Sequence, residues 1–413
     1  MIGMLVVLVP MFDENMAVGA YSVFAQKNNY FLNPAMLGTG QNDGATSVAG
    51  LELIQNIGLE ALSQGKEILV PLSNISIFAD LEDQCDAPHD KIVFLIDNTI
   101  PPIDMYVDRL RELKEKGYKL AIRKLAVAEF ENYRSILSLM DYVLLNNRKI
   151  AIDKAKIYFG KLYPNAKLCA GNITDQETFE TLKESGGYSL YEGSFYRMPA
   201  TKGKNDVAPL KINYIELLNI VNEGDFDLQK AAGVISRDTA LTISLLGMVN
   251  RMTVNSGISS INHAAAMLGQ KELKRWINTA VAGQLYADKP GELTRLSLLR
   301  ARFLENLAPH FNLAIRKEEL FLMGLFSVLD VILEKPMEEA LTWMKVSGDI
   351  YKALVDHEGP LNPVMEFMAQ YEDANWQEVS RLMLLEDVSM KDVQQAYMDA
   401  LCWYRDLISD TKK

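Results

Sequence analysis

The chain has 413 residues, a formal net charge of −12 at pH 7, and 49% hydrophobic and 23% charged residues. This length and composition predict a soluble globular protein with two domains, each of which buries its own core. The negative charge argues against nucleic acid as the main partner, because binding to a phosphate backbone needs clustered lysine and arginine.

Cysteines and apolar segments indicate the cellular setting. Cys85, Cys169 and Cys402 lie far apart without CxxC spacing, so they predict neither a disulfide framework nor a zinc site. The apolar stretch MLVVLVPMF has no basic segment before it and is soon followed by Asp13 and Glu14, which argues against a signal peptide. A membrane span needs about 18 uninterrupted apolar residues, and no stretch of the sequence is that long. We therefore expect a cytoplasmic protein without membrane insertion.

Short apolar segments alternate with amphipathic ones up to residue 199. The strand candidates are residues 5–12, 21–25, 67–73, 91–97, 119–125, 142–147, 167–172 and 188–196. Helix candidates between them include residues 48–62, 103–117 and 175–186, and either Thr174 or Asp175 is a good N-cap for the last. Strands separated by helices predict a parallel sheet covered on both faces. About eight strands favour a (β/α) barrel over an open sheet.

The pattern changes after residues 200–209, ATKGKNDVAP, which read as a linker. From residue 210 to residue 413 apolar residues recur at helical spacing, and no segment reads as a strand. The stripes of methionine and leucine in this half are typical of a helical core rather than of a cofactor site. The predicted fold class is therefore α/β in the first half and all-α in the second.

Several segments of both halves carry a family resemblance. In the first half these are VPMFDENMAVGAYSVFA, KIVFLIDNTIPP with the following LRELKEKGYKLAI, and YEGSFYRMP; in the second half they are ISRDTALTISLLGMVNRM, GISSINHAAAMLGQKELKRWI and EGPLNPVMEFMAQYEDANW. In this order they resemble bacterial signalling proteins that join a shortened, degenerate EAL domain to an HDOD domain. The resemblance implies an EAL-like (β/α) barrel over residues 1–199 and an all-helical HDOD domain over residues 210–413.

Active EAL enzymes hydrolyse cyclic di-GMP with two divalent cations, and the resemblance allows their ligand positions to be carried over. These positions of the former EAL site hold Ser22, Pro71, Leu95, Arg123, Lys124, Leu144, Asn146, Gly171, Thr174 and Glu192. Divalent cations need several oxygen ligands, usually with carboxylates among them. Adjacent cations such as Arg123 and Lys124 repel a metal ion. The resemblance therefore implies that metal binding is lost in this half.

The HDOD half resembles HD phosphohydrolases, in which an adjacent histidine and aspartate bind metal. The former HD pair falls on Ser327 and Val328. His263, His310 and His357 have no ligand spacing such as HxxxH, so solvated or locally hydrogen-bonded roles are expected for them. The sequence thus predicts no catalytic residue, no metal and no cofactor, and a protein that is not an enzyme.

Three functions stay open at this point. The leading hypothesis is a non-catalytic signalling protein of a cyclic-di-GMP-related network that controls motility or biofilm formation through protein partners, with a homodimer possible. A second is a sensor that binds cyclic di-GMP or another anionic nucleotide through Arg123 and Lys124, although these side chains could instead pair with carboxylates. A third is a residual cyclic-di-GMP phosphodiesterase. The basic cluster at residues 271–275 is read as a solvated helix face rather than as a site for an anionic partner.

Overall fold

The structure is a computed structural model that describes residues 4–26, 47–150, 152–197, 209–252, 260–285 and 291–411. Their contacts separate two compact units. The barrel unit comprises residues 1–198, 302–317 and 363–413, and the helical unit comprises residues 199–301 and 318–362. The predicted domain boundaries at 199 and 210 stay predictions. The predicted linker, 200–209, lies outside the described residues except for Pro209, where the first helix of the helical unit begins.

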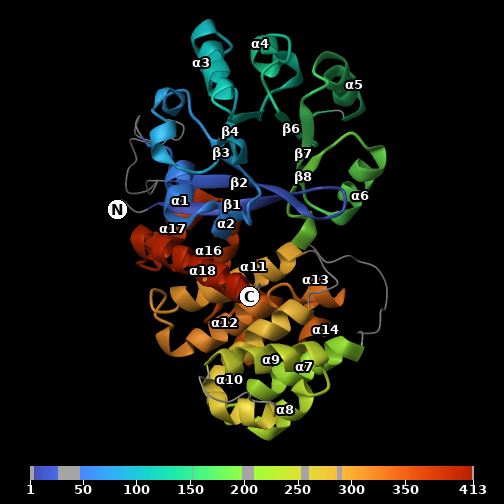
Figure 1. Cartoon of the computed structure of the whole chain (residues 1–413), viewed down its shortest axis with the longest axis vertical. Helices are drawn as coiled ribbons and strands as arrows, with labels where there is room; N and C mark the ends of the chain where they lie inside the picture. Colours follow the sequence, from blue (N-terminus) through green and yellow to red (C-terminus); the bar gives the residue numbers. More distant parts are fainter. Residues whose placement is uncertain are drawn as a thin grey trace. The chain divides into compact units, whose positions relative to one another are not determined.

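Strands in the described residues close into a barrel in the order in which they occur in the chain. They are β1 (Leu5–Phe12), β2 (Val18–Gln26), β3 (Glu67–Pro71), β4 (Ile92–Ile96), β5 (Lys119–Ile122), β6 (Tyr142–Asn146), β7 (Lys167–Ile173) and β8 (Leu190–Gly193). Figure 1 shows them in blue to green. The predicted barrel is confirmed.

One strand departs from the predicted parallel sheet. β1 runs antiparallel to both β2 and β8, whereas all the other neighbours are parallel. The cause is local: the Asp13 amide donates to Ala17 O at 2.8 Å, and the Asp13 carboxylate accepts from the amides of Asn15 and Ala17. This tight turn reverses the chain without a crossover helix, so the two strands that it joins are antiparallel.

Helices follow most of the parallel strands on the outside of the barrel (Figure 1). They are α1 (Ala49–Ile57), α2 (Leu59–Ser63), α3 (Asp104–Glu115), α4 (Arg134–Leu137), α5 (Ile152–Leu162) and α6 (Gln176–Ser185). The predicted helix 48–62 is divided at Gly58, whose φ of 88° lies in the left-handed region that glycine tolerates. At α6 the N-cap is Asp175, whose carboxylate accepts from the Thr178 amide at 2.8 Å.

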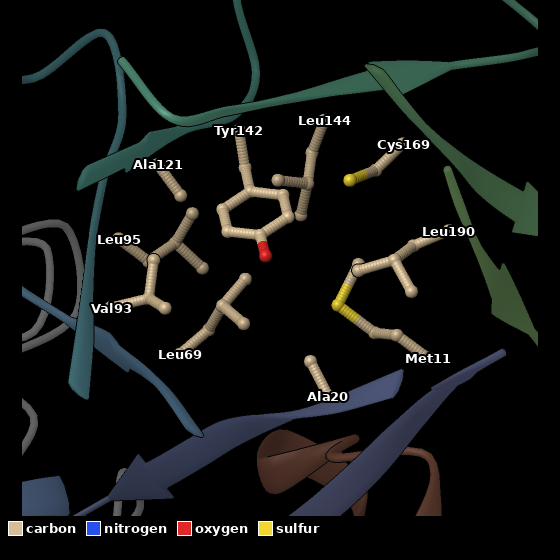
Figure 2. Packing of buried hydrophobic residues seen from close by; sticks show 10 residues of the cluster. All are labelled: Met11, Ala20, Leu69, Val93, Leu95, Ala121, Tyr142, Leu144, Cys169 and Leu190. Atoms are coloured by element: carbon tan, nitrogen blue, oxygen red, sulfur yellow. The ribbon is translucent and has the colours of Figure 1, made fainter. Parts of the chain in front are cut away.

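Apolar side chains fill the barrel interior, as Figure 2 shows. They belong to Met11, Ala20, Leu69, Val93, Leu95, Ala121, Tyr142, Leu144, Cys169 and Leu190. Because alternate residues of a strand point to the same face, each strand supplies its interior residues two positions apart. The one polar atom shown among these side chains, the Tyr142 hydroxyl, donates to the Glu67 carboxylate at 2.7 Å. The interior is thus a packed core, and polar chemistry is confined to its ends.

Three C-terminal helices belong to the barrel unit and pack beside β1. They are α16 (Asn362–Glu372), α17 (Trp376–Leu385) and α18 (Met390–Thr411). β8 pairs with β1 only at Met11 and Phe12, so the earlier residues of β1 lack a strand partner on that side. Side chains of the C-terminal helices take this place, because Gln394 accepts from the Met4 amide at 3.0 Å and Tyr371 binds the backbone of Val6.

The helical unit has no strand in its described residues, so the predicted all-helical half is confirmed. Its helices are α7 (Pro209–Val221), α8 (Leu228–Ile235), α9 (Thr239–Met252), α10 (Ile261–Leu285), α11 (Gly291–Leu307, which ends in the barrel unit), α12 (Lys317–Phe326), α13 (Leu329–Leu333), α14 (Met337–Leu341) and α15 (Gly348–Tyr351). α10 is interrupted at Gly269, where φ is 71°. Among the helices that the structure describes, none has the length and apolarity needed to cross a membrane.

Candidate binding site at the mouth of the barrel

Six of the predicted site positions face the barrel interior. Each comes two positions after a residue of the apolar interior, so its side chain, or for glycine its Cα, points to the same side of the barrel wall. They are Ser22, Pro71, Arg123, Asn146, Gly171 and Glu192, and we call them the mouth layer. They lie toward the carboxyl ends of the parallel strands, Arg123 directly after β5, which is where barrel enzymes build their sites. We call this end the mouth.

The other four predicted positions do not face the mouth in this way. Leu95 and Leu144 belong to the apolar core of the barrel and contribute packing. Thr174 lies in the loop before α6, where its hydroxyl accepts from the Arg148 guanidinium at 3.0 Å. Lys124 follows Arg123 directly and has the opposite orientation, as its backbone conformation explains.

Lys124 has a φ of 63°, which is uncommon for a residue with a side chain. Its ammonium group lies 2.9 Å from the Asp97 carboxylate, which is only 16% exposed. Burial raises the pKa of Asp97, but hydrogen bonds from Thr99 and Lys124 outweigh burial and leave that pKa below its usual value. The Asp97 carboxylate therefore neutralises Lys124. Pairing with a carboxylate was one of the two alternatives that the sequence left open for this cation.

Arg123, unlike Lys124, is not paired with a carboxylate of the described residues. Its guanidinium lies 5.0 Å from the centroid of the Phe24 ring and forms no hydrogen bond or ion pair with the described residues. Burial lowers the pKa of Arg123, and the charges of Glu192 and Asp97 counteract this. A guanidinium has five N–H donors. A half-buried group with these donors unused can bind an anion that reaches the mouth.

Two further polar side chains lie in the same layer. Ser22 is fully buried, and its hydroxyl oxygen has no hydrogen-bond partner in the part of the chain that the structure describes. Burial raises the pKa of Glu192, while the nearby charge of Arg123 lowers it. A Cβ added at Gly171 would lie 4.0 Å from the Glu192 carboxylate, so the backbone of β7 passes close to that group. The mouth thus combines the guanidinium of Arg123 and the hydroxyl of Ser22, which have no hydrogen-bond partner among the described residues, with the carboxyl group of Glu192, whose pKa is raised.

The divalent cations of the resembled enzymes do not fit this donor set. Asp97 is held by Lys124, and Glu192 faces the charge of Arg123. Pro71 and Gly171 offer no side-chain oxygen. Within the described ranges, no group of three or more histidine, cysteine, aspartate or glutamate side chains is arranged to hold a metal ion. The chemistry that these residues support is anion binding and proton transfer rather than coordination of a metal pair.

At the former HD pair the structure shows a buried polar contact. The Arg300 guanidinium donates to the Ser327 hydroxyl at 3.0 Å, and that hydroxyl donates to Gly324 O at 2.7 Å. Val328 is buried, and burial raises the pKa of the neighbouring Asp330. Arg300 thus holds the side chain of Ser327, and the role of the former HD pair stays a prediction. Elsewhere in this unit, Lys274 of the basic cluster pairs with Glu318 at 3.0 Å, and Leu273 is buried, as in a helix with one solvated face.

Comparisons with known proteins address both halves. The model of the HDOD domain matches residues 208–344. Cyclic di-GMP phosphodiesterase CdgJ of Vibrio cholerae serotype O1 is 28% identical over 325 residues, which cover 78% of this chain and 74% of the relative. Uncharacterized protein YuxH of Bacillus subtilis is 25% identical over 409 residues, which cover 97% of each chain. Among solved structures, the EAL domain of Mycobacterium smegmatis DcpA is similar with a TM-score of 0.34 and 14% identity, covering 46% of this chain and 90% of that one.

One prediction needs correction. The sequence predicted a protein that is not an enzyme, because the carried-over metal-ligand positions are changed. The similarity to CdgJ, whose name is that of a cyclic di-GMP phosphodiesterase, contradicts this prediction.

The match to the HDOD model agrees with the helical architecture of the second half. The predicted order of a barrel followed by this domain is also observed. The residues that match the HDOD domain, 208–344, thus follow the barrel in the chain.

Proposed function

We propose that the chain acts in cyclic di-GMP signalling and that the mouth of its barrel binds this nucleotide through Arg123. The observation that carries the proposal is the unused guanidinium of Arg123 against the Phe24 ring, in the same layer as the buried, unpartnered hydroxyl of Ser22. The similarity to CdgJ supports cyclic di-GMP as the ligand. The proposed setting is the cytoplasm, and protein partners would transmit the bound state.

The geometry suits a phosphodiester group in particular. The planar guanidinium presents parallel N–H groups that match two phosphate oxygens. The cation–π contact with Phe24 restrains the position of the guanidinium without using its N–H donors. Because the site is half-buried, an anion bound there is screened less by salt than one on the surface. Lys124 contributes little directly, since it is paired with Asp97.

Hydrolysis of the bound nucleotide is the second candidate, and the similarity to CdgJ favours it. In this mechanism Arg123 neutralises the phosphate while water attacks phosphorus. A new P–O bond forms, the P–O3′ bond breaks, Glu192 takes the proton of the attacking water, and the departing O3′ takes a proton from solvent water. A general base works best when its pKa is near the working pH, and burial moves the pKa of Glu192 in that direction.

Calorimetric titration with cyclic di-GMP tests the proposal. We expect the wild-type chain to bind and Arg123→Gln to bind about 10- to 100-fold more weakly, because charge-assisted hydrogen bonds are lost. Lys124→Gln is the matched control, since it removes an adjacent cation that is already paired. It should leave binding nearly unchanged. Absence of binding by the wild type, or equal losses in both variants, would overturn the proposal.

Chromatographic detection of the linear product in the same samples tests the second candidate. Turnover by the wild type that is lost in Glu192→Gln, while calorimetric binding is kept, supports hydrolysis. If the wild type binds cyclic di-GMP but yields no product with or without Mg²⁺ or Mn²⁺, binding alone is the function of the mouth.

A further inference from the structure

Two segments at the mouth end of the barrel are fixed against each other. One is the loop 72–79 after β3, which contains a 3-10 turn, and the other is the first turn of α3. The rings of Phe78 and Tyr106 lie 5.2 Å apart, and the Tyr106 hydroxyl donates to Asn74 O at 3.3 Å. One turn further along α3, the Arg109 guanidinium donates to two carbonyl groups of the loop at 2.9 and 3.0 Å. The loop therefore has a defined position on the helix.

These two segments expose four large apolar side chains. They are Ile75 (43% exposed), Phe78 (44%), Ile103 (53%) and Met105 (56%), and we call them the loop patch. Met105 precedes Arg109 by one helical turn, so it lies on the side of α3 that carries the loop. Clustered exposed apolar side chains on a rigid support are typical of an interaction surface rather than of a random surface.

The charges around the loop patch are acidic. Asp80 at the end of the loop and Asp104 in the first turn of α3 are exposed, and their carboxylates form no ion pair with the residues that the structure describes. The cations closest in sequence are already used, because Arg109 pairs with Glu112 at 2.7 Å and Arg111 pairs with Asp108 at 2.6 Å. An approaching partner therefore meets an apolar centre with a negative rim.

The apolar centre and the acidic rim of the loop patch together restrict which partner can bind there. A second copy of this chain placed symmetrically would bring the same acidic rim against itself, which like charges disfavour. An anionic membrane would be repelled for the same reason. An amphipathic helix with lysine or arginine beside its apolar face matches both the centre and the rim. We propose that the loop patch docks a basic amphipathic helix of a partner protein.

A synthetic helical peptide of leucine and lysine, labelled for fluorescence anisotropy, serves as the probe. We expect the full-length chain to bind it and to reject a leucine–glutamate peptide of the same length. The double variant Ile103→Ser/Met105→Ser should bind about tenfold more weakly or worse, because central apolar contacts carry most of the energy of an interface. Hydrogen exchange should show protection at residues 73–80 and 103–106 when the peptide is bound.

Matched variants keep the test specific. Ile157 on α5 is 71% exposed but lies outside the loop patch, so Ile157→Ser should leave affinity unchanged. Asp80→Asn/Asp104→Asn should weaken binding and flatten its dependence on salt. Equal affinity of the wild type and the Ile103→Ser/Met105→Ser variant would overturn the proposal, as would equal binding of the acidic peptide or preferential binding to phosphatidylserine vesicles.

Discussion

The hydroxyl of Tyr371 donates to the carbonyl oxygen of Val6 at 2.7 Å and accepts from the amide of the same residue at 3.1 Å. One side chain on α16 thereby makes both hydrogen bonds that a neighbouring strand would make to this residue of β1. Burial, together with Tyr397, raises the pKa of Tyr371 well above its usual value, so the hydroxyl keeps its proton. The end of β1 that β8 does not reach is completed by a helix.

The first prediction concerns this pair. Tyr371→Phe leaves the buried amide and carbonyl of Val6 without their partner, which costs about 1–3 kcal/mol of unfolding free energy. Urea unfolding followed by circular dichroism measures the loss. The control is Tyr158→Phe, because the Tyr158 hydroxyl donates to Glu131 at an exposed position where water can replace it. Equal stability of the Tyr371→Phe variant and the wild type would contradict the role assigned to the hydroxyl.

The second prediction extends this reasoning to the C-terminal helices. Deletion of residues 363–413 exposes the free edge of β1 together with the apolar surface that α16 and α18 cover. An uncovered edge strand pairs with other chains. We expect the shortened chain to elute from size exclusion as an aggregate. A monomeric shortened chain that unfolds cooperatively would show that the barrel is complete without these helices.

The distribution of apolar residues predicts where the strands lie in the sequence. It does not predict their direction or the residues that pack against them. The segment LVVLVPMF gives the bounds of β1 correctly, because a continuous apolar run that ends at polar residues is typical of a buried strand. Its antiparallel direction depends on hydrogen bonds of one carboxylate, that of Asp13. The contact between Val6 and Tyr371 depends on tertiary packing between residues far apart in the chain. Local periodicity carries no information about such a partner.

The candidate site was likewise predicted only in part from the sequence. The family resemblance assigned Ser22, Arg123 and Glu192 to one former site, and the structure places them on β2, directly after β5 and on β8, where they face the barrel interior. In the sequence Arg123 and Lys124 read as one cation pair. The left-handed backbone at Lys124 separates them, so that one is paired with Asp97 and the other is unused. A backbone conformation of this kind is set by the fold and not by the residue type.

The third prediction tests the close approach of β7 and β8 at the mouth. Gly193 has a φ of 154°, and a Cβ there would lie 1.9 Å from Ile173 O. Gly193→Ala forces the backbone apart and should cost more than about 2 kcal/mol of unfolding free energy. Gly171→Ala is the control, because its nearest contact would be an ordinary 3.6 Å to Leu145 O. Thermal unfolding of both variants compares them, and a tolerated alanine at Gly193 would contradict the close approach.

The fourth prediction follows from the carboxyl group of Glu192. Burial raises its pKa in the folded chain, so the folded state keeps a proton that the unfolded state releases above about pH 4.3. The contribution of this group is therefore fully present below that pH and is lost as the pH rises through the folded pKa. Glu192→Gln lacks the titrating group. We expect the unfolding free energy of the wild type to fall relative to that of Glu192→Gln as the pH rises above about 4.3, measured by urea unfolding at several pH values. Glu184→Gln on the exposed side of α6 is the control, because it removes a carboxyl group that is not buried. Parallel curves for Glu192→Gln would mean that its carboxyl group is solvated, and the mouth would then lack its candidate base.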